Sequence, residues 1–185
     1  MISFMKHLGS YFYSSRVACT SLPDASDFDL LTLNGLEKAL SFFKERGNGG
    51  CQGFFRWMEV KRINLHSTRS DGSSLLHIAV KIGALSVIQQ LLFRDIDPNQ
   101  RDGLGMSAVH LACMRGNLEA LKCLKTFGAD LEIQDHLGRT PLHMAVLAED
   151  QECLEYLLLQ GVDLETRDLE GRTPLHLAVL EQSYG

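Results

Sequence analysis

The side chains best suited to metal or nucleophilic chemistry are a set of evenly spaced histidines and five scattered cysteines. The histidines His77, His110, His143 and His176 are each 33 residues apart. The cysteines are Cys19, Cys51, Cys113, Cys123 and Cys153, and none forms the C-x-x-C pair typical of zinc or redox sites. Metal ligands must converge on one ion, and histidines one repeat apart are too far separated to do so. We therefore expect no metal site, no cofactor and no catalytic residue.

Each of the four histidines lies in the same short sequence motif, which indicates a repeated structural element. The motif reads GRTPLHMAVLAED from Gly138 and GRTPLHLAVLEQ from Gly171, with less similar copies from Gly72 and Gly105. Its glycine suits a turn with positive φ, and Thr140 can then cap a helix that has Pro141 in its first position. A second helix is predicted from Glu152 to Gln160, with Gly161 as its left-handed cap.

A 33-residue unit that carries T-P-L-H-x-A resembles the ankyrin repeat, and the resemblance covers residues 69–185. It implies an all-α fold, an α-solenoid of stacked helix-turn-helix repeats joined by β-hairpin-like loops. We divide this segment into unit one (69–101), unit two (102–134), unit three (135–167) and an incomplete unit four (168–185). One such unit cannot bury its own apolar face, so its stability must come from stacking on its neighbours. In that setting we expect each histidine to hydrogen-bond into the adjacent hairpin.

Three positions depart from the pattern where a helix should end. Glu149 and Gln182 stand where units one and two have Gly83 and Gly116, and Asp95 stands where the later units have a capping glycine. A side chain at such a turn must accept a strained backbone or force the turn into another shape.

The segments on either side of the recognisable repeats are less regular. Residues 1–28 are predicted to be a disordered or poorly packed tail, with a targeting segment as the alternative. Residues 29–68 are predicted to be a helical N-terminal capping region, a degenerate helix pair from about Asn34 to Arg62, although an unrelated small domain stays open. In unit four we expect poor cover over Leu177 and Val179. This leaves three explanations: the chain is a fragment of a longer protein, its last helix frays, or a partner completes the last unit.

Composition excludes several classes of protein. Hydrophobic residues make up 45% of the chain and charged residues 22%, which is typical of a soluble domain, and no apolar run approaches the roughly 18 residues of a membrane span. The net charge of −5 without a cluster of Lys and Arg disfavours a nucleic-acid partner. Unpaired cysteines are typical of a cytoplasmic or nuclear protein. We find no phosphate loop or nucleophile elbow, and so expect neither an enzyme nor a small-molecule substrate.

The family resemblance implies a concave binding face built from the hairpin tips and the first helices, used mostly to bind other proteins. On this face we expect one apolar row at the tips (Leu104, Leu137 and Leu169, which lies next to the aligned position) and a second on the helices (Met114, Leu147 and Leu180). Arginines that could pair with acids of a partner lie among them, namely Arg101, Arg115, Arg139, Arg167 and Arg172. The predicted partner-binding residues are Leu104, Met106, Met114, Arg115, Leu137, Arg139, Leu147, Leu169, Arg172 and Leu180. The predicted partner is a protein segment with apolar anchors and acidic residues; alternatively, these are ordinary exposed residues without a role.

Three classes of function follow, in order of preference. The first is a non-catalytic protein-binding module, an adaptor, scaffold or inhibitor; a short likeness to ankyrin domains that sequester Rel-type transcription factors does not assign a partner. The second is a regulatory or substrate-docking domain of a longer enzyme whose catalytic part lies beyond residue 185. The third is a nucleic-acid binder, which the acidic balance disfavours.

Overall fold

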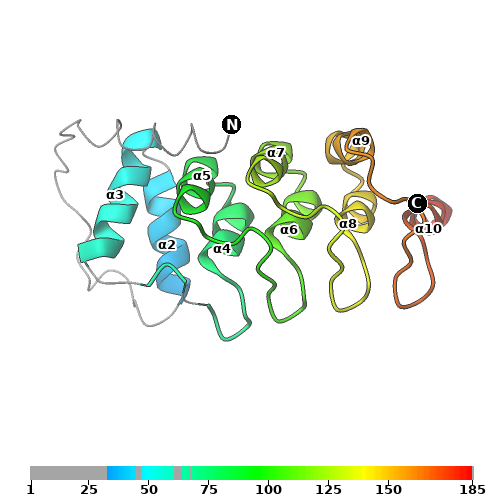
Figure 1. The fold of residues 1–185 in the computed structure, drawn as a ribbon, viewed down its shortest axis with the longest axis horizontal. Helices are drawn as coiled ribbons and strands as arrows, with labels where there is room; N and C mark the ends of the chain where they lie inside the picture. The colour runs from blue at the N-terminus through cyan, green and yellow to red at the C-terminus, as the bar shows by residue number, and fades with distance from the viewer. Residues whose placement is uncertain (1–32, 45–46, 61–63, 67, 185) are drawn as a thin grey trace.

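The computed structural model describes residues 33–44, 47–60, 64–66 and 68–184, and within these ranges its regular elements are helices. They are α2 (Leu33–Lys44), α3 (Gly47–Val60), α4 (Leu75–Ile82), α5 (Leu85–Phe93), α6 (Ala108–Met114), α7 (Leu118–Thr126), α8 (Pro141–Leu147), α9 (Gln151–Leu159) and α10 (Pro174–Tyr184). Figure 1 shows them stacked in one row of helix pairs, with the hairpin loops projecting along one edge. The predicted all-α solenoid is confirmed. No helix in the described ranges is long and apolar enough to cross a membrane.

The first helix of each unit starts as the sequence predicts. Ser74, Ser107 and Thr140 precede α4, α6 and α8 in an extended conformation, and Pro141 fills the first position of α8. The hairpins are only hairpin-like, since their pairing amounts to isolated bridges such as Arg101 with Ser107. The cap and the proline act locally, which explains why the sequence located these helix starts correctly.

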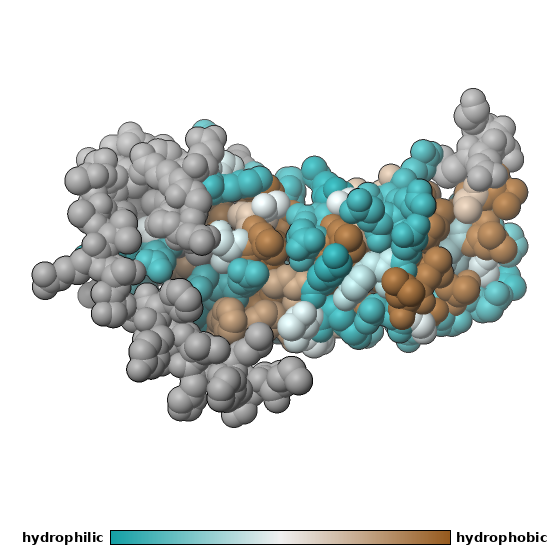
Figure 2. Space-filling model, turned by 90° about the horizontal axis from the view of Figure 1, so that it is seen from above, coloured by the Kyte–Doolittle hydropathy of each residue, from teal (hydrophilic) through white to brown (hydrophobic). Residues whose placement is uncertain are grey.

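Small and branched apolar residues make the interface between neighbouring units. Ala79, Ala112 and Ala145 are fully buried at equivalent places in α4, α6 and α8, which pack side by side. The second helices α5, α7 and α9 form a parallel row against them (Figure 1). Seen from above, the surface is largely hydrophilic, with apolar residues gathered toward the C-terminal end (Figure 2). A continuous core therefore runs along the stack, as one repeat alone could not provide.

Helices α2 and α3 pack against each other and against unit one. Ala39 and Leu40 of α2 and Phe54 of α3 are fully buried, and α2 contacts α4 while α3 contacts α5. The Glu37 carboxylate of α2 accepts a 2.7 Å bond from Arg69, the residue that replaces the aspartate of the other units. The helix pair predicted from about Asn34 to Arg62 is thus present. The division into tail, capping region and repeats stays a prediction, and residues 1–28 lie outside the described residues.

In unit four, one of the two side chains that were predicted to be poorly covered is in fact buried. Val179 is 58% exposed, as expected, but Leu177 is only 5% exposed. Helix α10 packs on α8, and Leu177 occupies the position equivalent to the buried Met144 of α8. Val179 lies two residues further along, which turns it to the other side of the helix. Cover for Leu177 therefore comes from the preceding unit.

Two of the irregular positions adopt the strained alternative, whereas Gln182 lies inside α10 and forms no turn. Glu149 has φ 53° and Asp95 has φ 59°, so both side-chain-bearing residues occupy the left-handed region that glycine fills in the other units. Each keeps the turn in the family shape at the cost of backbone strain.

Candidate functional site

The repeated histidines join each unit to the next. His77 accepts hydrogen bonds at Nδ1 from the backbone N–H of Ser74 (3.2 Å) and from its hydroxyl (2.7 Å). Because Nδ1 is an acceptor, the proton lies on Nε2, which donates to the carbonyl of Met106 in the following hairpin at 3.0 Å. His110 and His143 make the equivalent bonds to the carbonyls of Arg139 and Arg172, at 3.0 and 3.2 Å. The expected bond into the adjacent hairpin is confirmed for these three histidines.

Burial keeps these rings neutral. Desolvation lowers the pKa of His77, His110 and His143 below the ordinary value, although the carbonyl acceptor at Nε2 partly opposes the shift. A charged imidazolium would also carry a proton on Nδ1, facing two donors. His176 of unit four keeps the bonds to Thr173 but is exposed, and no acceptor for its Nε2 lies among the described residues.

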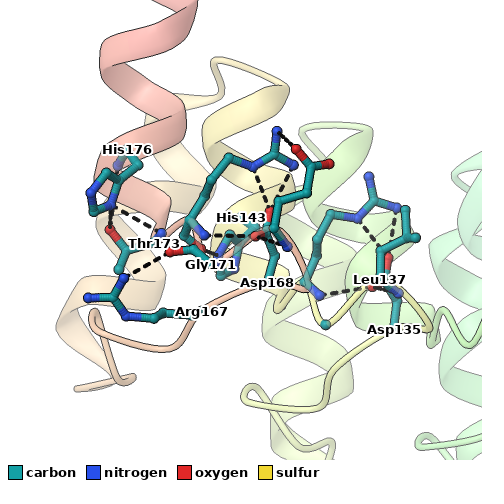
Figure 3. A network of polar contacts seen from close by, with 12 residues as sticks. Asp135, Leu137, His143, Arg167, Asp168, Gly171, Thr173 and His176 are labelled. Atoms are coloured by element: carbon teal, nitrogen blue, oxygen red, sulfur yellow. Dashed lines mark hydrogen bonds and ion pairs between the residues drawn. The ribbon is translucent and has the colours of Figure 1, made fainter.

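Aspartates shape the hairpin tips that carry the predicted binding residues. Asp135 Oδ1 accepts from the backbone N–H groups of Leu137 (2.8 Å) and Arg139 (2.9 Å), and Asp168 does the same for Glu170 and Arg172. Burial alone would raise the pKa of Asp135, but these bonds and the Arg139 guanidinium lower it overall. Figure 3 shows the Asp135 and Asp168 networks next to each other. The role of these aspartates in shaping the tips was not predicted from the sequence, although their 33-residue spacing could have indicated it.

Neighbouring tips are also tied together through their backbones. The N–H of His136 donates to the carbonyl of Leu104 at 3.0 Å, and the N–H of Leu169 donates to that of Leu137 at 2.8 Å. The leucines of the tip row therefore belong to hydrogen-bonded neighbours, and their side chains start from a fixed backbone.

Six of the ten predicted binding residues form two exposed apolar rows. In the tip row Leu104 is 64% exposed, Leu137 53% and Leu169 75%. In the helix row Met114 is 39% exposed, Leu147 37% and Leu180 43%. Together these six residues are called the apolar surface below. Their exposure in successive units agrees with what was predicted from the sequence, whereas their role in binding stays a prediction.

Met106 does not belong to this surface. Its side chain is only 9% exposed and lies in the core cluster, so the expectation that it is an exposed tip residue is wrong. Met106 shares its position with Arg139 and Arg172, but an unbranched apolar side chain can fold back into the core where a guanidinium turns to an aspartate.

Most of the arginines proposed for the partner already have partners within the chain. The guanidinium of Arg139 lies 2.7 Å from the fully buried carboxylate of Asp135, and that of Arg172 lies 2.8 Å from Asp168. Arg101 and Arg167 donate to the backbone carbonyls of Gly105 and Gly171. Arg115 differs, because it is exposed and forms no salt bridge with a described residue.

An open cleft of about 450 Å³ lies where α4 and α6 end. Lys81 and Arg115 line it from the first-helix side, and Glu119 and Glu152 line it from the second helices. Two cations and two carboxylates balance each other there, so the cleft by itself is not an anion site. It does leave open space beside Arg115. In the described part of the chain no group of His, Cys, Asp or Glu is placed to hold a metal ion.

The comparisons with known proteins agree with this architecture. A family model described as ankyrin repeats, in three copies, matches residues 76–168 and 109–185, which together make up more than half of the chain. The search of the curated proteins gave no match. The chain therefore belongs to the ankyrin-repeat family.

Proposed function

We propose that this chain is a non-catalytic adaptor, scaffold or inhibitor that binds a segment of another protein on the apolar surface. Ankyrin repeats are generally protein–protein interaction modules. The observation that supports this site is the repetition of exposed apolar side chains in successive units, three at the tips and three on the first helices. Isolated exposed leucines are ordinary, but apolar side chains exposed in successive units of a rigid stack are typical of interaction sites.

The stack supplies the stiffness that such a site needs. The tip leucines start from hydrogen-bonded backbone, and Leu147 ends a helix whose preceding residues are buried. Binding therefore costs little ordering of the surface itself. Covering one well-exposed leucine contributes about 1–2 kcal/mol, so removing one such anchor should weaken binding about fivefold to thirtyfold.

Affinity capture from the source cells with the full chain tests the proposal. We expect Leu147→Glu, combined with Met114→Glu, to lose the captured proteins because it places charge in the middle of the apolar surface. Leu159→Glu is the matched control, since Leu159 is highly exposed on the second helix α9 and lies outside the apolar surface. Circular dichroism and thermal melting would show that all variants fold. Proteins that bind the folded double variant as well as they bind the wild type would refute the proposal.

The cellular location follows from the same reasoning and stays a prediction. Cys113, Cys123 and Cys153 are free thiols in the structure. We place the protein in the cytoplasm or the nucleus, where thiols remain reduced, and fluorescence microscopy of the tagged chain would test this.

A further inference from the structure

We propose that the segment bound on the apolar surface is dipolar, with an acidic residue over units one and two, a basic residue over units three and four, and apolar residues between them. This proposal rests on the proposed function and specifies the partner of the same site. It changes the partner expected from the sequence, which had apolar anchors and acidic residues, by adding a basic residue at one end.

The first observation is that the charge around the end of the first helix changes sign along the stack. The three aligned positions there read Lys81-Ile82-Gly83 in unit one, Met114-Arg115-Gly116 in unit two and Leu147-Ala148-Glu149 in unit three. Lys81 already lies 3.4 Å from the Glu37 carboxylate of α2. The chain beside the helix row is therefore basic at Arg115 in unit two and acidic at Glu149 in unit three.

The second observation is that the charges nearest the helix row are available. Arg115 directly follows Met114, Glu149 comes two residues after Leu147, and both are exposed without a salt bridge to a described residue. The tip arginines Arg139 and Arg172, in contrast, are neutralised by Asp135 and Asp168. A partner carboxylate would have to compete with a buried one to reach Arg139, whereas Arg115 offers its guanidinium without competition.

The third observation concerns space and the rest of the charge distribution. Arg115 lines the open cleft at the ends of α4 and α6, so there is open space beside it, although Glu119 and Glu152 on the second-helix side would repel a carboxylate that entered the cleft more deeply. Residues 149–185 contain nine acidic residues and two arginines, and one of these arginines, Arg172, is paired with Asp168 and Glu170. An acidic segment over units three and four would meet like charge along its length, which costs affinity, while a basic residue is attracted there.

Such charges decide which segment binds, and in which direction, more than how tightly it binds. An exposed ion pair contributes little next to a buried leucine, and it weakens as salt is added. Each of the two contacts should therefore change the dissociation constant by about threefold to tenfold at low salt.

A random peptide library displayed on phage and selected on the full chain supplies the probes. Peptides are kept when Leu147→Glu abolishes their binding and Leu159→Glu does not, which restricts them to the apolar surface. We expect these peptides to carry an acid on one side of an apolar centre and a base on the other. We expect Arg115→Glu and Glu149→Lys each to weaken them about threefold to tenfold, measured by fluorescence anisotropy at low salt.

Matched controls separate a local contact from net charge. Lys125→Glu and Glu155→Lys make the same charge changes on exposed positions of the second helices α7 and α9, and should change the dissociation constant less than about twofold. Exchanging the acid of a selected peptide for lysine should restore its binding to the Arg115→Glu variant.

The outcomes distinguish the two proposals. Peptides that depend on Leu147 but respond equally to Arg115→Glu and Lys125→Glu, or that carry no opposed charges, overturn the dipolar partner and leave the binding surface intact. If every selected peptide tolerates Leu147→Glu, or if none is selected, both proposals are wrong.

Discussion

The histidine of unit two offers a sharp test of how the stack is held together. His110 is fully buried, accepts from the backbone N–H (3.1 Å) and hydroxyl (3.0 Å) of Ser107, and donates to the carbonyl of Arg139. His110→Ala would leave the buried N–H of Ser107 without its acceptor and the carbonyl of Arg139 without its donor. It would also leave a cavity the size of the ring. Each unsatisfied buried group costs about 1–3 kcal/mol, so we expect the free energy of unfolding to fall by about 3–4 kcal/mol.

His176 is the natural control, because it has the same local contacts without the contact between units. Its ring is exposed and bonds only within its own cap, to Thr173. His176→Ala should therefore cost about 1 kcal/mol, in the range of a lost helix cap. Urea unfolding followed by circular dichroism at neutral pH would measure both losses. Equal losses in the two variants, or a loss below about 1 kcal/mol for His110→Ala, would refute the role that we assign to the bond between units.

Three further predictions concern acidity, turn strain and the hairpin tips. Burial lowers the pKa of His77, His110 and His143 in the folded state, so the unfolded chain binds protons first as the pH falls through the ordinary histidine value of 6.5. The free energy of unfolding should therefore decrease from about pH 7.5 to about pH 5.5, and urea titrations that show no decrease would contradict this. Glu149→Gly should raise the free energy of unfolding by about 0.5–1 kcal/mol, because glycine accepts φ 53° without strain; a lower melting temperature would argue against strain at this turn. Asp135→Ala removes the acceptor of two backbone N–H groups and the partner of Arg139, and should lower the free energy of unfolding by about 2–3 kcal/mol, which thermal melting would reveal.

Sequence reasoning located the fold and the exposed apolar rows for different reasons. The helix starts at Thr140 and Thr173 follow from local capping, and the 33-residue period places each unit without reference to its neighbours. The exposed rows at the tips and the first helices could be predicted because equivalent positions have equivalent surroundings in a regular stack. Met106 is the exception to this reasoning. Its position is equivalent to that of Arg139, but its apolar side chain packs into the core.

Pairing between charged residues was the part of the site that sequence could not decide. Arg115 and Arg139 appear equivalent as arginines near a predicted binding face. The structure separates them, because an aspartate four residues before Arg139 turns its carboxylate toward the guanidinium, whereas Arg115 follows the end of helix α6 beside an open cleft. The direction of each side chain, which the period does not specify, decides which charges remain available.

The sequence by itself determined the repeat, its turns and caps, and hence the solenoid, because these depend on residues within a few positions of one another. Only the tertiary structure decided which apolar side chains of the incomplete unit four stay exposed. Burial in a stack depends on the neighbouring unit, which covers Leu177 and leaves Val179, two residues away, in solvent. It also decided that the charge beside the apolar surface changes sign between Arg115 and Glu149, since availability depends on contacts that no repeat pattern contains.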